Sequence, residues 1–276
     1  MTTWSGEATP QGMPLGPGHW LRIGLRGAAI VVILLAGLAC LLPLRLVERP
    51  LFGQRRPVTP FITPLVCRAT YLVLGMRYRR EGRPMTQSGA VVANHASWLD
   101  IFSLNYAKRV YFVSKSEVAR WPVIGFLARS VGTVFITRDP RAARDQKAVF
   151  EERLLAGHKL LFFPEGTSSD GMRVLPFKST LFQAFFSQSL RREMHVQPVT
   201  VIYDAPEGQD ARFYSWWGDM EFGSHVLQVL GAPRQGSVKV IYHAPLRVAD
   251  FADRKALARH AEDAVRGAMP PERRVV

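Results

Sequence analysis

Residues 89–115 read GAVVANHASWLDIFSLNYAKRVYFVSK, and this stretch decides the fold. It predicts a short buried strand at 89–94, a helix at 97–107 and a second strand at 109–115. The alternation continues downstream, with helices at 122–132, 141–157, 180–190 and about 249–268, and strands at 133–138, 159–166, 196–203 and 238–248. Strands alternating with helices predict an α/β domain with a mostly parallel layered sheet and flanking helices.

An apolar segment precedes this domain. Residues 27–44, GAAIVVILLAGLACLLPL, carry no charge over 18 positions. As a helix they would be about 27 Å long, which barely matches a bilayer core. They either span the membrane or lie in one leaflet beside a second helix, predicted at 61–82. Arginines on both sides leave the orientation open, and the lack of a clean cleavage site makes a signal peptide less favoured.

These segments divide the chain into four parts. We expect a flexible N-terminal tail at 1–19, a membrane-anchoring helical pair at 20–78, the α/β domain at 79–270 and a short tail at 271–276. Within the domain, residues 204–237 form an irregular insertion to which the sequence assigns no role.

Composition limits the partners. The chain of 276 residues is 47% hydrophobic and 21% charged, as in a folded protein, and its net charge is +14. Such a basic surface suits anionic lipid headgroups, anionic cofactors or nucleic acid. The apolar segment favours a membrane surface, and the lack of a basic-aromatic stripe or known module argues against nucleic acid. Cys40 and Cys67 form neither a zinc pattern nor a disulfide framework, so we expect a reducing compartment.

His95 and Asp100 follow the strand at 89–94. On one continuous helix, five residues would place the two side chains about 140° apart, too far to meet. They can meet if His95 lies in the turn, Ser97 is the N-cap and Asp100 faces back from the first helical turn. The same arrangement is also an ordinary capping box without chemistry. Taken alone, the spacing leaves both interpretations open.

A second polar cluster follows the apolar strand 160–163. A carboxylate such as Glu165 at the end of a buried strand is costly unless it has partners or a function. Gly166 allows the backbone to approach a ligand closely, and Thr167 could help to bind an anion. An ordinary polar turn remains the alternative.

Three further residues lie at or near other strand ends. The planar guanidinium of Arg138 could bind a phosphate. Lys115 could be catalytic or simply solvated, and Pro198 is more plausible as a residue that shapes the strand. Each of these signals is weak when taken alone.

Together the blocks resemble the glycerolipid acyltransferase family, the 1-acyl-glycerol-3-phosphate acyltransferases, over roughly 85–205. The family blocks N-H-x-S-x-x-D, G-x-x-F-I-x-R, F-P-E-G-T-x-S and a proline-containing strand are matched by Asn94, His95, Ser97 and Asp100; by Gly132, Phe135, Ile136 and Arg138; by Phe163, Pro164, Glu165, Gly166, Thr167 and Ser169; and by Pro198 and Val199. The N-terminal helical pair also resembles bacterial members.

The resemblance implies a role for each site residue. His95 would be the general base that deprotonates an acceptor hydroxyl, and Asp100 would hold its tautomer. The acceptor headgroup would be positioned by Arg138, Glu165, Gly166 and Thr167, while Lys115 would polarise the thioester carbonyl. Ser97 would serve as a cap. A metal is disfavoured because no further ligand is suitably spaced, and no cofactor is implied beyond the acyl donor.

The implied function is acylation of lysophosphatidate to phosphatidate. The donor would be acyl-CoA or acyl carrier protein, at the cytoplasmic face of a bacterial inner membrane. An alternative acceptor is lyso-ornithine lipid, because WWGDMEF at 216–222 resembles a feature of some such members. A different class, a non-catalytic basic protein bound to anionic membrane, would leave two polar strand ends without a function. Acyl-chain length, donor preference and oligomeric state are not indicated by the sequence.

Overall fold

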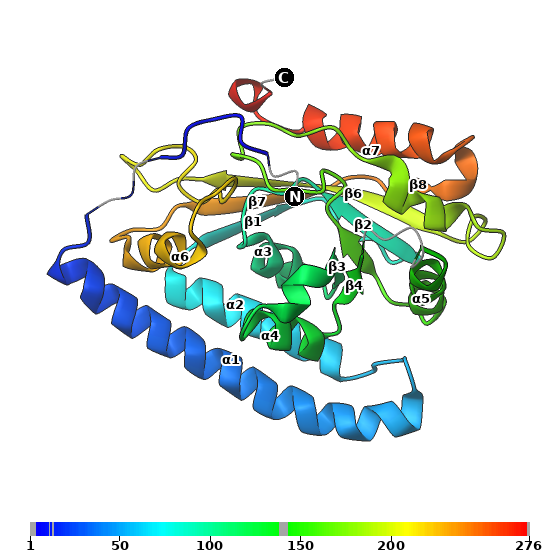
Figure 1. Ribbon diagram of the computed structural model, residues 1–276, viewed down its shortest axis with the longest axis horizontal. Coiled ribbons are helices and arrows are strands. Elements are labelled where there is room, and N and C mark those ends of the chain that lie inside the picture. Colours follow the sequence, from blue (N-terminus) through cyan, green and yellow to red (C-terminus); the bar gives the residue numbers. More distant parts are fainter. Residues whose placement is uncertain (1–3, 11, 13, 138–142, 275–276) are drawn as a thin grey trace.

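The computed structural model describes residues 4–10, 12, 14–137 and 143–274 (Figure 1). Its centre is an 8-stranded sheet in the order β1-β7-β6-β2-β5-β3-β4, with β8 pairing with β6. The strands are β1 Arg77–Glu81, β2 Gly89–Ala93, β3 Tyr111–Lys115, β4 Val134–Ile136, β5 Leu160–Phe162, β6 His195–Asp204, β7 Ser237–Tyr242 and β8 Leu246–Arg247. Neighbours are parallel except where β6 pairs with β7 and β8, so the predicted mostly parallel α/β fold is confirmed.

Helices cover both faces of the sheet. They are α1 Pro17–Phe52, α2 Ile62–Leu74, α3 Asp100–Ala107, α4 Ile124–Val131, α5 Ala143–Leu155, α6 Phe222–Gly231 and α7 Arg254–Gly267, with 3₁₀ turns η1 Thr59–Phe61, η2 Ser116–Arg120, η4 Ser179–Phe186, η5 Val248–Asp250 and η6 Pro271–Arg273. Alternation along β2 explains the layering: Val91 and Ala93 pack in the core beneath α2, α3 and α6, whereas Ala90 and Val92 pack beneath α5, η4 and α7.

Helix α1 lies along the outside of the molecule, beside α2 (Figure 1). Near its start, Arg22 Nε donates to the carbonyl of Gly231 at the end of α6 (2.7 Å). Near its end, Glu48 Oε1 accepts hydrogen bonds from the Val58 and Thr59 amides (2.6 and 2.9 Å). The start of the helix is therefore fixed to α6, and its end to the connection that leads to α2.

The outer surface of α1 is apolar. Many of its large side chains are exposed, including Trp20, Leu21, Leu25, Val32, Leu35, Leu46 and Leu51. Within the described residues, α1 is the one helix long and apolar enough to cross a membrane. This surface is consistent with membrane association.

The helix predicted at 61–82 is wrong in its second half. Helix α2 ends at Leu74, because Gly75 adopts a left-handed conformation (φ 75°) that terminates it. Residues 77–81 then form β1, which pairs in parallel with β7 at the edge of the sheet. The strand was missed because its sequence, RYRRE, is mostly polar and exposed.

Three other predictions need correction. The helix expected at 180–190 is the 3₁₀ segment η4, Ser179–Phe186. The single strand expected at 238–248 is divided into β7 and β8. The insertion 204–237 is not wholly irregular, because it contains α6, whose first turn is capped by the Glu221 carboxylate accepting from Gly223 and Ser224 amides.

Candidate active site

Strand β2 ends at a turn fixed by Asn94. This side chain is almost fully buried, and its amide bridges to β6 in both directions: Nδ2 donates to the Val201 carbonyl (2.9 Å) and Oδ1 accepts from the Val201 amide (2.8 Å). The bridge holds β2 and β6 together just beyond their ladder. It fixes the position from which His95 leaves the sheet.

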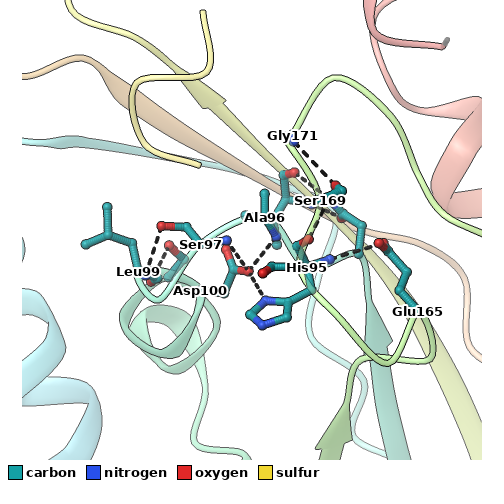
Figure 2. A network of polar contacts seen from close by, with 12 residues as sticks. His95, Ala96, Ser97, Leu99, Asp100, Glu165, Ser169 and Gly171 are labelled. Carbon is teal, nitrogen blue, oxygen red and sulfur yellow. Dashed lines mark hydrogen bonds and ion pairs between the residues drawn. The ribbon is translucent and has the colours of Figure 1, made fainter. Parts of the chain in front are cut away.

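His95 and Asp100 are in contact across this turn, as the spacing predicted (Figure 2). His95 Nδ1 lies 2.7 Å from Asp100 Oδ2. The same oxygen accepts hydrogen bonds from the amides of Ala96 (3.0 Å) and Ser97 (3.1 Å). Asp100 is completely buried, whereas the His95 side chain is 23% exposed. The carboxylate is thus held by the protein while the imidazole can reach a ligand.

Ser97 is not the residue immediately before the helix. Helix α3 begins at Asp100, three positions later than predicted, and Leu99 precedes it. The cause is the Asp100 carboxylate, whose bonds to the Ala96 and Ser97 amides hold these residues in a turn. Ser97 Oγ still accepts from the Leu99 amide (3.2 Å), so the hydroxyl stabilises the turn that precedes the helix.

A buried hydroxyl network supports the other side of Asp100. Tyr203, on β6, donates its hydroxyl to Asp100 Oδ1 (2.8 Å). The same hydroxyl is 2.7 Å from Ser103 Oγ, which is 2.5 Å from the Tyr71 hydroxyl on α2. Both carboxylate oxygens of Asp100 are therefore hydrogen-bonded. Sequence reasoning missed Tyr203, because nothing in the run VTVIYD distinguishes it from other core residues.

The His95 ring is also positioned by packing. It stacks on the Phe163 ring with centroids 4.0 Å apart and planes 11° from parallel. The backbone is held as well: the His95 carbonyl accepts a hydrogen bond from the Ser169 amide (2.9 Å), and the Ala96 carbonyl accepts one from the Trp216 amide (2.8 Å). The insertion 204–237 is thus attached directly to the turn that carries His95.

Glu165 lies beneath this turn. Its Oε1 accepts a hydrogen bond from the His95 amide (3.1 Å), and its side chain is 1% exposed. Burial raises the pKa of this carboxyl well above its usual range, although the amides of His95 and Leu175 oppose the rise. A carboxyl buried in this way supports the backbone of His95 through Oε1, while Oε2 has no hydrogen-bond partner among the described residues.

This burial leads to a prediction about pH. Because the pKa of Glu165 is higher in the folded than in the unfolded chain, the wild type loses stability as pH rises above the unfolded value of about 4.3. Glu165→Gln keeps the acceptor for the His95 amide but cannot ionise. The melting temperature of this variant, relative to wild type, should therefore increase from pH 4 to pH 8.

Glu221→Gln provides a control of opposite sign. Hydrogen bonds from Ser224 and Gly223 lower the pKa of the exposed Glu221. As pH rises to about 5, Glu221→Gln should therefore lose stability relative to wild type, and above that pH the two curves should run parallel. Parallel pH curves for wild type and Glu165→Gln would contradict the prediction.

Gly166 and Thr167 continue the loop after Glu165. Gly166 has a φ of 74°, and a Cβ there would lie 2.9 Å from Lys178 Nζ, so both conformation and space favour glycine. Thr167 Oγ1 accepts a hydrogen bond from the Trp4 amide (3.5 Å). The N-terminal segment therefore reaches this loop.

Two further expected residues, Lys115 and Pro198, lie on other strands. Lys115 ends β3, which β5 separates from β2. Pro198 lies inside β6 opposite Val92, and its carbonyl accepts from the His243 amide. Arg138 lies outside the described residues.

The chain was compared with known protein families and curated proteins. The profile of the family described as Acyltransferase matches residues 76–202. A lyso-ornithine lipid O-acyltransferase from Rhodobacter capsulatus is 56% identical over 96% of both chains. A 1-acyl-sn-glycerol-3-phosphate acyltransferase from Neisseria gonorrhoeae is 30% identical over 72% of this chain and 76% of that protein.

Comparison with solved structures supports the fold. The crystal structure of the 1-acyl-sn-glycerophosphate acyltransferase from Thermotoga maritima matches with a TM-score of 0.64, covering 90% of this chain and 94% of that one. At 19% identity, this likeness concerns the fold alone.

Proposed function

Because this chain belongs to the acyltransferase family, we propose that it transfers a fatty acyl group from a thioester donor to the hydroxyl of a lyso-ornithine lipid. The proposed acceptor rests on the 56% identity to the Rhodobacter capsulatus lyso-ornithine lipid O-acyltransferase, which extends over 96% of both chains. The general activity, acyl transfer, follows from membership of the family.

The expectation of lysophosphatidate as acceptor is wrong. Relatives named as 1-acyl-sn-glycerol-3-phosphate acyltransferases are more distant, such as the Neisseria gonorrhoeae protein at 30% identity over 72% of this chain. The blocks around His95 and Glu165 report the chemistry that both kinds of enzyme share, and they carry no information about the headgroup.

In the proposed mechanism, His95 is the general base. Its Nδ1 hydrogen bond to Asp100 leaves Nε2 to take the proton of the acceptor hydroxyl. The hydroxyl oxygen attacks the thioester carbonyl, a carbon–oxygen bond forms, and the carbon–sulfur bond breaks. The proton on Nε2 then passes to the leaving thiolate. Asp100 stabilises the transient imidazolium and fixes its orientation.

Other residues position the reactants. Glu165 holds the His95 amide, and Gly166 and Thr167 shape the loop beside it. Lys115 remains the candidate for polarising the thioester carbonyl, and Arg138 the candidate for binding the acidic part of the headgroup. No cofactor beyond the donor, acyl-CoA or acyl carrier protein, is required by this scheme.

We place the enzyme on the surface of the bacterial inner membrane, with its site on the cytoplasmic side. In this proposal α1 lies along the membrane and does not cross it, because Arg22 joins it to α6 and the helix packs beside α2. Its exposed apolar side chains would enter one leaflet, and the net charge of +14 would favour anionic lipid.

An acceptor assay tests the proposal. Purified full-length protein in lipid vesicles is given one radiolabelled donor, acyl-CoA or acyl carrier protein in separate reactions. Lyso-ornithine lipid and lysophosphatidate are offered at the same mole fraction. We expect kcat/KM for lyso-ornithine lipid to be at least about tenfold higher, since about 1.4 kcal/mol of differential binding suffices. A faster reaction with lysophosphatidate would contradict the proposed acceptor.

A further inference from the structure

A cluster of arginines lies near the amino-terminal end of the parallel strand β3, away from the carboxyl ends of the strands, where His95 lies. His95 follows the carboxyl end of β2, whereas Tyr111 begins the parallel strand β3. A small cavity there is lined by Tyr111, Val110, Val131 and Arg109 of the α/β domain and by Leu41, Arg56, Thr59, Pro60 and Thr63 of α1, α2 and their connection. The cavity is separate from the candidate active site.

Two arginines of this cavity have unused hydrogen-bond donors. Arg56 Nε and Arg109 Nη1 are buried and have no hydrogen-bond partner among the described residues. Their guanidinium groups instead lie over aromatic rings, Arg56 over Tyr111 (5.4 Å) and Arg109 over Phe61 (4.7 Å). Buried N–H groups of a charged side chain are costly when unpaired.

The cluster also has an excess of positive charge. The Arg153 side chain, which is 8% exposed, also lies over the Tyr111 ring (4.8 Å). Arg45 Nη1 is a third buried donor without a hydrogen-bond partner among the described residues. Burial, with the positive charge of Arg45, lowers the pKa of Arg56. The phenolic group of Tyr111 is within electrostatic range of Arg45, Arg56, Arg109 and Arg153.

The nearby carboxylate, Glu48, offsets only one of these four positive charges and does not fill the unused donors. Glu48 is buried, but its oxygens already accept hydrogen bonds from the Val58 amide, the Thr59 amide and the Thr59 hydroxyl. Its contact with Arg45 is longer, at 3.8 Å. His158 adds no charge, because burial and the adjacent Arg153 lower its pKa to about 4 and the imidazole is neutral. A water molecule could fill the unused donors, but only an anion would also offset the charge.

The surroundings indicate an amphiphilic anion. Large apolar side chains are exposed around the cavity on the α1–α2 side, including Leu44, Val58, Phe61 and Leu65. A ligand with a phosphate group for the arginines and acyl chains for this apolar surface would satisfy both features. We propose that Arg56 and Arg109 bind the phosphate of an anionic phospholipid at a site distinct from the one that performs acyl transfer.

Thermal unfolding of the full-length protein in neutral detergent tests this site. Added phosphatidylglycerol should raise the melting temperature, whereas phosphatidylcholine should not. In Arg56→Gln and in Arg109→Gln, the phosphatidylglycerol concentration that gives half of this rise should increase about 10- to 100-fold, as expected for loss of a charged hydrogen bond. No acyl donor or acceptor is present, so the result is independent of the proposed function.

Arg55→Gln is the matched control. Arg55 is the exposed neighbour of Arg56 on the same connection. Arg55→Gln should shift the phosphatidylglycerol concentration that gives half of the rise by at most about fivefold, which is the effect of one surface charge near anionic lipid. Equal shifts for Arg55→Gln and Arg56→Gln would overturn the site. Arg56→Lys, which keeps the charge but lacks Nε, should still weaken the lipid effect and replaces Arg56→Gln if that variant does not fold.

Inorganic phosphate distinguishes the source of the anion. At matched ionic strength, phosphate without lipid should leave the melting temperature of the wild type unchanged within about 1 °C, because apolar contacts contribute to binding. A rise as large as that with phosphatidylglycerol would show a site for free phosphate and would overturn the lipid assignment.

Discussion

His95→Ala is expected to lower kcat by about 10²- to 10⁴-fold, which is the usual contribution of a general base. Without the imidazole, water would have to take the proton of the acceptor hydroxyl. The His95 side chain is 23% exposed, and without it Asp100 keeps its bonds to the Ala96 and Ser97 amides and to Tyr203, so the fold should be retained. The assay follows transfer of label from the acyl donor to lyso-ornithine lipid.

A second histidine serves as the control. His260 is exposed on α7, where its ring contacts Phe251, and it lies on the opposite layer from α3. His260→Ala should retain wild-type activity. If His95→Ala kept full activity with an unchanged melting temperature, direct attack assisted by this imidazole would be ruled out.

Asp100→Asn is expected to have an effect of similar size, about 10³- to 10⁴-fold on kcat. An asparagine amide pointing at His95 would favour the wrong tautomer, in which Nε2 carries the proton and cannot act as a base. The substitution also affects stability. Asp100 accepts from the Ala96 and Ser97 amides on one oxygen and from Tyr203 on the other, and the single carbonyl of asparagine cannot serve both sides.

The stability effect can be separated from the catalytic one. One unpaired buried donor costs about 1–3 kcal/mol, so the melting temperature of Asp100→Asn should fall by several degrees. Activity is therefore measured well below that temperature. Asp204→Asn, next to Tyr203 but half-exposed and paired with Arg273, should change neither quantity appreciably. Activity of Asp100→Asn within about tenfold of wild type would argue against the role of the carboxylate.

The contact between His95 and Asp100 could be predicted because it is local. The two residues are five positions apart, with a strand before them and a helix after them. These constraints leave few conformations for the turn, and the side chains meet when His95 lies in the turn and Asp100 faces back toward it. The support from Tyr203 could not be predicted in this way. Tyr203 is 103 positions from Asp100, and its pattern of alternation is that of any buried strand residue.

The same distinction explains the errors in the fold. Strand β1 is held by its parallel pairing with β7, more than 150 residues away. Because of this distant pairing, a mostly polar sequence forms a strand although its residues have no local preference for one. The insertion 204–237 supports the turn that carries His95, because the Trp216 amide donates a hydrogen bond to the Ala96 carbonyl. This contact could be found only from the three-dimensional structure. The acceptor was predicted wrongly because the recognised motifs indicate the family, and relatives in the family act on different acceptors.

The hydroxyl of Tyr71 limits how this enzyme can be made soluble. Tyr71 belongs to α2, yet it completes the buried network that runs through Ser103 and Tyr203 to Asp100. A truncation before β1 would therefore remove part of the support of the active site together with the apolar surface. Polar substitutions at exposed positions of α1, such as Leu21, Leu25 and Val32, would reduce detergent dependence and leave that network intact.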